Sequence, residues 1–231
     1  MKVLKFGGSS VQSPDSIRKV IKIIDEQPQP CIAVVSAFKG VTDQIIQTYH
    51  LASMRDESYK KHIDLIRNRH LEAANELVSK ERRESVIYYV NKLLDEFKDL
   101  LYGIFLIGDL TPKTTDHLLS LGERLSSFII SNSIPDTRCI DMRHFIETDS
   151  RHGNAQVDFE STNINIREAL GNLNGVAIAP GFIAANSLGD ITTLGRGGSD
   201  YTAAIIASAV NAEILEIWTD VDGFMTADPR K

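Results

Sequence analysis

The stretch 2-KVLKFGGSSVQSPDSIRKVIKIIDEQPQPCIAVVS-36 combines the signals of a strand, a glycine turn, a helix and a second strand, in that order. Residues 13–27 start with a serine that can cap a helix and a proline that suits its first turn, and their apolar residues recur at helical spacing. Residues 31–36 form a continuous apolar run, which is typical of a strand buried on both faces. A strand–helix–strand unit predicts a parallel sheet, so we expect an α/β fold.

The block from residue 42 to about residue 132 is expected to be helical throughout, because its apolar residues recur at helical rather than alternating spacing. No flexible linker flanks the block, so we interpret it as a helical insertion that packs on the same core. The predicted helices lie around residues 45–51 and over residues 58–79, 81–104 and 114–133.

The remainder of the chain returns to strands and helices. Residues 182–186 and 191–194 are interpreted as a hairpin, because a glycine-containing turn separates them. The helix that starts at Ser199 and the strand 213–218 would complete a second strand–helix–strand unit. Further strands are predicted at residues 137–141, 155–159 and 175–180, with a short helix over residues 160–171.

The composition excludes several classes of protein. The chain has 231 residues and a net charge of -6, which disfavours nucleic-acid binding because no basic surplus is available for a phosphate backbone. The densest basic cluster, Arg67, Arg69, Arg82 and Arg83, is interleaved with acids and is interpreted as a solvated helical face. No apolar run approaches the roughly 18 residues of a membrane span, and no signal peptide is recognisable. We therefore expect a cytoplasmic protein that has no nucleic-acid or membrane partner.

Several familiar site signatures are missing from the sequence. It contains neither a P-loop nor the dinucleotide-binding G-x-G-x-x-G after the first strand, and no G-x-S-x-G elbow. No cluster of histidines, cysteines and acids has the spacing of a zinc site, so no protein-bound metal is predicted. Cys31 and Cys139 are expected to be free thiols in strands, since a disulfide would need an oxidising compartment.

Four polar segments share one position in the predicted fold, directly after a strand. Ligands collect beyond the carboxyl ends of parallel strands, and glycine N–H groups ahead of a helix favour an anion. A single glycine pair after a strand is often only a turn. Four such segments, among them the two that carry Lys5 and Arg196, instead favour an anion site. The segments are 5-KFGG-8, 36-SAFKG-40, 195-GRGGSD-200 and 219-TDVDG-223.

Two charged residues have competing interpretations. Arg196 could be an ordinary surface arginine, but its place between glycines and ahead of a helix favours a carboxylate or phosphate partner, which guanidinium binds in a bidentate fork. Glu123 could be a solvated helix acid. It also follows a glycine and lies between Leu121 and Leu125, which would allow it to point into a cleft.

Five motifs occur in the order 5-KFGGSSV-11, 34-VVSAFKGVTD-43, 120-SLGERLSS-127, 192-TTLGRGGSDYTAA-204 and 216-EIWTDVDGFMTADPR-230. Together they resemble the aspartate kinases of the amino acid kinase family. The resemblance implies a three-layer α/β/α sandwich around a mainly parallel sheet. It also implies transfer of the γ-phosphate of ATP to the side-chain carboxylate of L-aspartate, the first step toward lysine, threonine and methionine, with Mg²⁺ on the β- and γ-phosphates.

The resemblance also implies residue roles. Lys5 would contact the transferred phosphoryl group, and Asp200 would orient Lys5 or the metal-bound phosphates. Arg196 would bind the α-carboxylate of aspartate and Glu123 its α-amino group. The residues implied for the nucleotide are Lys5, Phe6, Gly7, Gly8, Thr219, Asp220, Met225 and Arg230. Those implied for aspartate are Ser36, Thr42, Glu123, Phe182, Arg196, Gly197, Gly198 and Ser199.

Some residues depart from the family pattern. Met225 stands where a tyrosine is frequent, GFIAAN replaces GFIG, and Phe38-Lys39 replaces small residues. In the family, further helices and strands and paired ACT domains follow the position of Lys231, so we expect residues 1–231 to be an incomplete catalytic domain of a homo-oligomeric protein. A dehydrogenase half could also follow, as in bifunctional aspartokinase–homoserine dehydrogenases. Two alternatives remain: a family member that phosphorylates glutamate or a related substrate, and a fragment that binds ligand without turnover.

Overall fold

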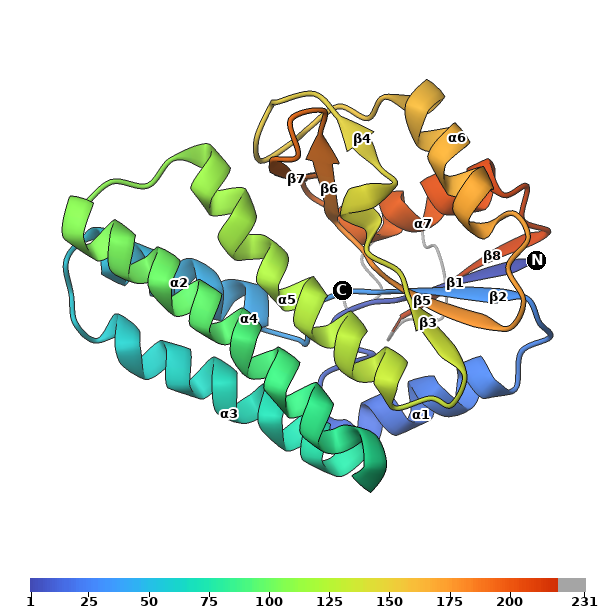
Figure 1. Ribbon diagram of the computed structural model, residues 1–231, viewed down its shortest axis with the longest axis horizontal. Coiled ribbons are helices and arrows are strands. Elements are labelled where there is room, and N and C mark those ends of the chain that lie inside the picture. The colour runs from blue at the N-terminus through green and yellow to red at the C-terminus, as the bar shows by residue number, and fades with distance from the viewer. Residues whose placement is uncertain (220–231) are drawn as a thin grey trace, which may run out of the picture.

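A five-stranded parallel sheet forms the centre of the computed structural model, which describes residues 1–219 (Figure 1). Its strand order is β3-β5-β2-β1-β8, and every neighbouring pair is parallel. The strands are β1 (Lys2–Phe6), β2 (Cys31–Val35), β3 (Thr137–Cys139), β5 (Val176–Pro180) and β8 (Ile214–Trp218). The predicted α/β class and parallel sheet are confirmed.

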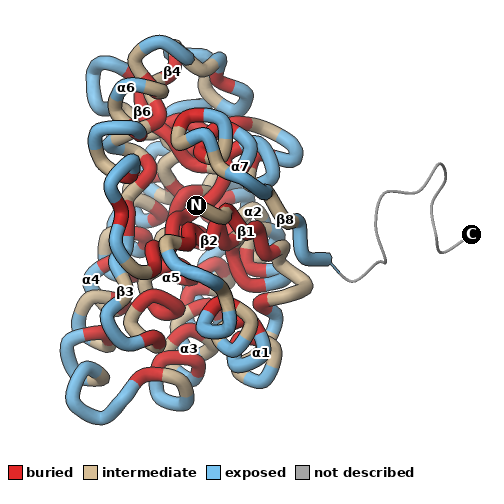
Figure 2. Tube along the Cα trace, turned by 90° about the vertical axis from the view of Figure 1, so that its right-hand side faces the viewer, coloured by how far each residue is buried: buried red, intermediate tan, exposed pale blue. Residues whose placement is uncertain are grey.

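The sheet is covered on both faces, which gives the three layers that the family resemblance implied. Leu4 and Phe6 of β1 belong to a core shared with the helices below the sheet in Figure 1, whereas Val3 belongs to a second core above it. β2 is buried at every position and lies at the centre of the molecule in Figure 2. The apolar run 31–35 is therefore continuous because both of its faces are covered.

The lower layer consists of α1 and a bundle of four helices. Ser13 caps α1 as predicted, since its hydroxyl accepts a hydrogen bond from Ser16 N at 3.3 Å. Within the bundle, α5 packs directly on the sheet, whereas α3 and α4 pack on the other helices (Figure 1). The helices are α1 (Pro14–Asp25), α2 (Val41–Ser53), α3 (Tyr59–Leu77), α4 (Lys80–Ile107) and α5 (Pro112–Asn132).

The upper layer contains a second, three-stranded sheet that the sequence analysis did not predict. Its order is β4-β6-β7, and β6 and β7 pair antiparallel as the predicted hairpin. Because β7 belongs to this sheet, the proposed second strand–helix–strand unit is wrong: β7 and β8 lie in different sheets. The layer contains β4 (Glu147–Thr148), α6 (Phe159–Leu170), β6 (Ile183–Asn186), β7 (Ile191–Thr193) and α7 (Gly198–Ala209), with a short 3-10 turn at Met142–His144.

The predicted strand at residues 155–159 is also wrong. Only Val157 forms an isolated bridge, to Thr148, and α6 begins at Phe159. The side chain of Asp158 accepts hydrogen bonds from the N–H groups of Glu160 and Ser161, so it starts a helix where the alternating pattern suggested a strand.

Two other expectations concern the whole chain. Cys31 and Cys139 are both free, as expected. Among residues 1–219, no helix is both long and apolar enough to cross a membrane.

The packing of α4 predicts the effect of two leucine substitutions. Leu94 is 0% exposed, and Leu94→Ala should lower the free energy of unfolding by about 2–5 kcal/mol, because it removes buried carbons and leaves a cavity. Leu106 in the same helix is 57% exposed, and Leu106→Ala should change it by less than about 0.5 kcal/mol. Urea denaturation of both variants measures the difference, and equal effects would contradict the packing described for α4.

Candidate active site

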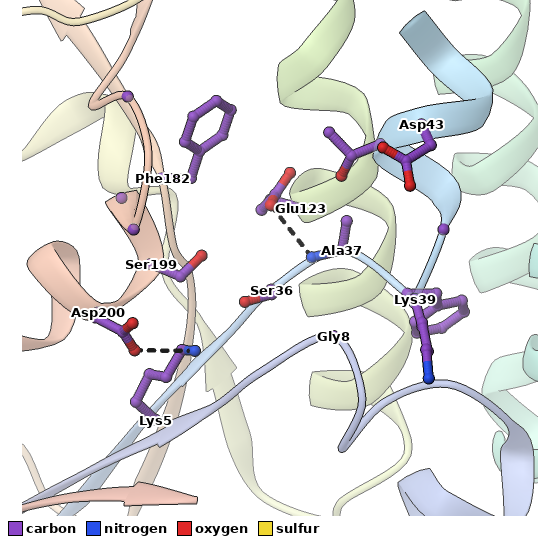
Figure 3. Close-up of a pocket in the computed structure, with 16 residues that line it drawn as sticks. Lys5, Gly8, Ser36, Ala37, Lys39, Asp43, Glu123, Phe182, Ser199 and Asp200 are labelled. Carbon is purple, nitrogen blue, oxygen red and sulfur yellow. Dashed lines mark hydrogen bonds and ion pairs between the residues drawn. The ribbon is translucent and has the colours of Figure 1, made fainter. Parts of the chain in front are cut away.

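A cleft of about 420 Å³ lies beyond the carboxyl ends of β1 and β2 (Figure 3). The parallel register pairs Phe6 with Val35, so the loops that follow these two strands start side by side. The start of α7 and the turn before β6 form the opposite wall. The residues of the predicted site that line the cleft are Lys5, Gly8, Ser36, Thr42, Glu123, Phe182, Gly197, Gly198, Ser199 and Asp200.

Lys5 and Asp200 form an ion pair across the base of the cleft. The Lys5 Nζ to Asp200 Oδ1 distance is 2.9 Å, and Lys5 is buried whereas the Asp200 side chain is half exposed. A Cβ atom at Gly7 would lie 3.3 Å from Lys5 Nζ, so Gly7 leaves room for the lysine although it does not itself line the cleft. The pair joins β1 to α7 and holds a cation at a point that a ligand can reach.

Two helices begin at the cleft, and neither has a side-chain cap. Gly40 is the N-cap of α2, and Gly197 is the N-cap of α7, both with left-handed backbone. Both glycines line the cleft. The first N–H groups of a helix have no intrahelical partner and carry a partial positive charge, so both helix ends favour an anion there.

Glu123 is the buried acid among the residues that line the cleft. Its Oε1 accepts a hydrogen bond from Ala37 N at 3.2 Å, while Oε2 has no partner among the described residues. Burial raises the pKa of Glu123 to about 7. Of the two sequence interpretations, the structure supports the one in which Glu123 points into the cleft (Figure 3).

The close approach of α5 to the loop after β2 places Glu123 there. A Cβ atom at Gly122 would lie 2.7 Å from the Cβ of Ala37, so any larger residue would push the helix away. One turn later, the hydroxyl of Ser126 donates to the backbone oxygen of Ser36 at 2.8 Å. The motif 120-SLGERLSS-127 therefore fixes the distance between helix and loop.

Phe182 has the unusual left-handed φ of 68° for a residue with a side chain. Its N–H donates to the hydroxyl of Thr202 at 2.9 Å, and a Cβ at Gly198 would lie 2.7 Å from the ring. A Cβ at Gly181 would likewise lie 2.6 Å from the side chain of Ser199. The turn before β6 and the start of α7 are thus packed without space between them, which stabilises this backbone conformation.

Arg196 does not line the cleft. It lines a neighbouring cavity of about 490 Å³ together with Asp116 and Thr193, and Phe182 and Gly195 line both spaces. Arg196 is exposed, so its side chain lies beside the cleft rather than in it.

The residues predicted for the nucleotide are only partly gathered at the cleft. Phe6 and Thr219 line a separate cavity of about 350 Å³, where Phe6 stacks on Trp218 at 6.1 Å between ring centroids. Asp220, Met225 and Arg230 lie outside the described residues. In residues 1–219, no group of three or more histidines, cysteines or acids is arranged to hold a metal ion.

Arg69 contributes to the site in a way that its sequence context concealed. It is half-buried rather than solvated, and it donates to Lys39 O at 2.7 Å and to Gln12 O at 2.9 Å. Its guanidinium also lies over the ring of Phe38, which stacks on the buried His70 at 4.9 Å. Arg69 therefore joins the loop after β1 to the loop after β2. No local pattern could have revealed this, because the two carbonyl partners are 30 and 57 residues away.

Comparisons with known proteins agree with this architecture. The sequence matches the Amino acid kinase family over residues 1–231. It is 33% identical to lysine-sensitive aspartokinase 3 of Escherichia coli over 99% of this chain and 51% of that protein. It is 32% identical to the chloroplastic bifunctional aspartokinase/homoserine dehydrogenase of Daucus carota, over 98% of this chain and 25% of that protein.

The fold is similar to that of a solved aspartokinase. The structure of E. coli aspartokinase III in complex with aspartate and ADP superposes with a TM-score of 0.91 at 31% identity, over 100% of this chain and 51% of that chain. The chain thus spans about half the length of the monofunctional relatives and about a quarter of the plant bifunctional ones.

The burial of Glu123 predicts a pH-dependent gain in stability on substitution. The folded-state pKa of about 7 lies above the usual value near 4.5, so the folded protein holds the extra proton between these values and loses stability as the pH rises through them. Glu123→Gln removes the buried charge and should raise the free energy of unfolding by roughly 1–3 kcal/mol at pH 8, and by much less at pH 4.5.

Urea denaturation at both pH values measures this difference. Glu72→Gln, at an exposed position of α3, is the matched control and should have an effect below about 0.5 kcal/mol at either pH. A gain for Glu123→Gln that is the same at pH 4.5 and pH 8 would contradict the raised pKa.

Proposed function

This chain belongs to the amino acid kinase family, and from that premise we propose that it phosphorylates the side-chain carboxylate of L-aspartate with ATP and Mg²⁺, giving 4-phospho-L-aspartate. The observation that carries the proposal is Glu123, a buried carboxyl with one unpartnered oxygen, in a cleft that two lysines, two exposed aspartates and two helix N-termini also line. Such a cleft suits a ligand with several anionic groups and one ammonium group. An α-amino acid with an acidic side chain, next to a nucleotide phosphate, meets that description.

Glu123 is proposed to bind the free α-amino group of the substrate. Its unpartnered Oε2 can accept a hydrogen bond from an ammonium group, and the positive charge would favour the ionised form of the acid. An acetylated amine has no charge and fewer donors, so it would leave the buried acid unpaired, which is costly. This argues for an amino acid and against an N-acetylated substrate.

The phosphoryl transfer needs no general base. The side-chain carboxylate of aspartate has an unperturbed pKa of about 3.9 and is already ionised at neutral pH. One of its oxygens forms a bond to the γ-phosphorus while the bond from that phosphorus to the β,γ-bridging oxygen breaks and ADP leaves. No proton is transferred. The protein has to align two anions and stabilise the charge on the transferred group.

Lys5 is proposed to stabilise that charge. Its Nζ lies at the base of the cleft, 2.9 Å from Asp200 Oδ1, which fixes the position of the ammonium group without removing it from the cleft. The loop that contains Gly8 and the N-termini of α2 and α7 would supply N–H groups to the phosphates. Besides Glu123, the acids that line the cleft are Asp43 and Asp200, and they could orient a Mg²⁺ ion that would bind the phosphates and neutralise their negative charge.

Arg196 is proposed to bind the α-carboxylate. Its side chain lies at the neighbouring cavity, so this role requires it to turn toward the cleft past Phe182. Gly195 and Gly197, both with a φ of 74°, flank it. A phosphorylated aspartate would enter the synthesis of lysine, threonine and methionine, and the aspartokinase relatives support that assignment.

The proposal predicts selective and pH-dependent binding of L-aspartate. Isothermal calorimetry in the presence of Mg²⁺ and ADP should detect binding of L-aspartate and weaker binding of L-glutamate. The affinity for N-acetyl-L-aspartate should be about 100-fold or more below that for L-aspartate. The affinity for L-aspartate should fall as the pH is lowered below 7, because Glu123 then becomes protonated. Binding of the acetylated compound as tight as that of L-aspartate would exclude the role of Glu123, and preference for L-glutamate would favour the other family substrate.

Lys5→Met should lower the rate of aspartate-dependent ADP release by about 100-fold or more, because it removes a charge aimed at the transferred group. Lys2→Met is the control on the same strand, since Lys2 pairs with Glu216 at the opposite end of β1 and should leave the rate unchanged. Release of ADP is followed in a coupled assay. Ligand binding by the unaltered chain without any release would identify a binding fragment, and an unaltered rate in Lys5→Met would remove Lys5 from its role.

A further inference from the structure

Asp116 is a buried acid on α5 that the proposed reaction does not use. Its side chain is completely buried, and it precedes Glu123 by seven residues in the same helix. Seven residues are close to two helical turns, so the two acids lie on the same face of α5, about 10 Å apart along its axis. Glu123 faces the cleft, whereas Asp116 lines the neighbouring cavity that Arg196 also lines.

The carboxylate of Asp116 is surrounded by donors from two distant segments. From the loop before α6, His152 Nδ1 lies 2.9 Å and Gly153 N 3.0 Å from Asp116 Oδ2. From β7, Thr193 N donates to Oδ2 at 3.2 Å and its hydroxyl donates to Oδ1 at 2.6 Å. Helix α5 of the lower layer is thereby joined to the small sheet of the upper layer through one side chain.

The segment held by Asp116 leads directly into the motif 195-GRGGSD-200. Thr193 is two residues before Gly195, and its backbone oxygen accepts from Ala155 N at 2.9 Å. Leu194 N then donates to Phe182 O at 2.9 Å, and Gly198 N to Gly195 O at 3.0 Å. The position of Thr193 therefore sets where the chain enters the turn that carries Arg196.

We propose that Asp116 is a positioning residue that fixes the 195–200 segment relative to Glu123, and so sets the affinity for the amino acid substrate. The two groups assigned to the amino acid, Glu123 and Arg196, come from different layers of the molecule. Asp116 joins those layers through the helix that carries the first and the strand that leads to the second. This inference rests on the proposed function for the identity of the ligand, but not for the structural link.

The chemistry of the site requires a carboxylate at residue 116. The two backbone N–H groups can only donate, and both carboxylate oxygens accept at least two hydrogen bonds. An asparagine has a single acceptor oxygen, so its NH₂ group would face at least one N–H donor in either orientation. Asp116→Asn keeps the size of the side chain and disrupts only this pattern.

A purely structural role would weaken all ligands alike, so the test compares two ligands. In the full chain, Asp116→Asn should lower the affinity for L-aspartate by roughly tenfold or more. It should lower the affinity for Mg²⁺–ADP by less than about threefold, and calorimetry measures both. The substitution should accelerate amide hydrogen exchange in residues 150–154 and 193–198 more than it does in α3 and α4.

Thr162→Val is the matched control in the same layer. The Thr162 hydroxyl is buried and accepts from Glu147 N at 3.0 Å, so its loss should cost stability without changing the 195–200 segment or the ratio of the two affinities. If Asp116→Asn does not fold, Thr193→Val serves instead, because it removes only the hydroxyl bond of 2.6 Å and keeps the backbone bond.

The two readouts separate this inference from the proposed function. The positioning role would be overturned if amide hydrogen exchange in residues 193–198 of the folded variant is unchanged. It would also be overturned if the affinities for both ligands fall equally. If the unaltered chain binds no L-aspartate, the proposed substrate is wrong, and the exchange comparison still decides whether Asp116 holds the segment.

Discussion

The parallel pairing of β1 with β2 on one side and β8 on the other is the constraint on which the rest of the structure depends. It places Phe6 beside both Val35 and Trp218, so the carboxyl ends of β1, β2 and β8 lie together at one edge of the sheet, where the strands end. The helices and the second sheet then only need to enclose this edge. Helix α5 does so from below and α7 from above, and both bring a charged side chain to the cleft.

At that edge of the sheet, groups that favour an anion lie close to one buried acid. Lys5 and two uncapped helix N-termini create a region suited to anions, and Asp200 neutralises only part of it because it is half exposed. Glu123 is the exception, since burial holds its pKa near 7. Under the proposed function, this distribution of charge distinguishes a zwitterion from a simple anion, and the distinction depends on how closely α5 approaches the loop after β2.

The sequence predicted the central sheet better than the upper layer. Residues 31–35 are apolar on both faces, and that pattern has one structural explanation. The strand predicted at residues 155–159 failed because the capping by Asp158 outweighed a weak alternation. The short strand β4 has two residues, too few for any periodicity to identify.

In the candidate site, too, the sequence predicted some features and not others. Glycine-rich segments after strands were recognisable, and the close approach at Gly122 explains why Glu123 is buried. Periodicity could not show which side of α5 meets the sheet, so the orientation of Glu123 stayed open. The roles of Arg69 and Asp116 depend on partners 30 to 77 residues away, and no local pattern contains that information.

The packing around Phe182 constrains how this site can evolve. Its ring fills the space that a side chain at residue 198 would need, and the side chain of Ser199 fills the space that one at residue 181 would need. A substitution that adds a side chain at Gly181 or Gly198 therefore collides with Ser199 or Phe182 unless that partner changes as well. New side chains at residues 181 and 198 could therefore arise in evolution only through paired changes.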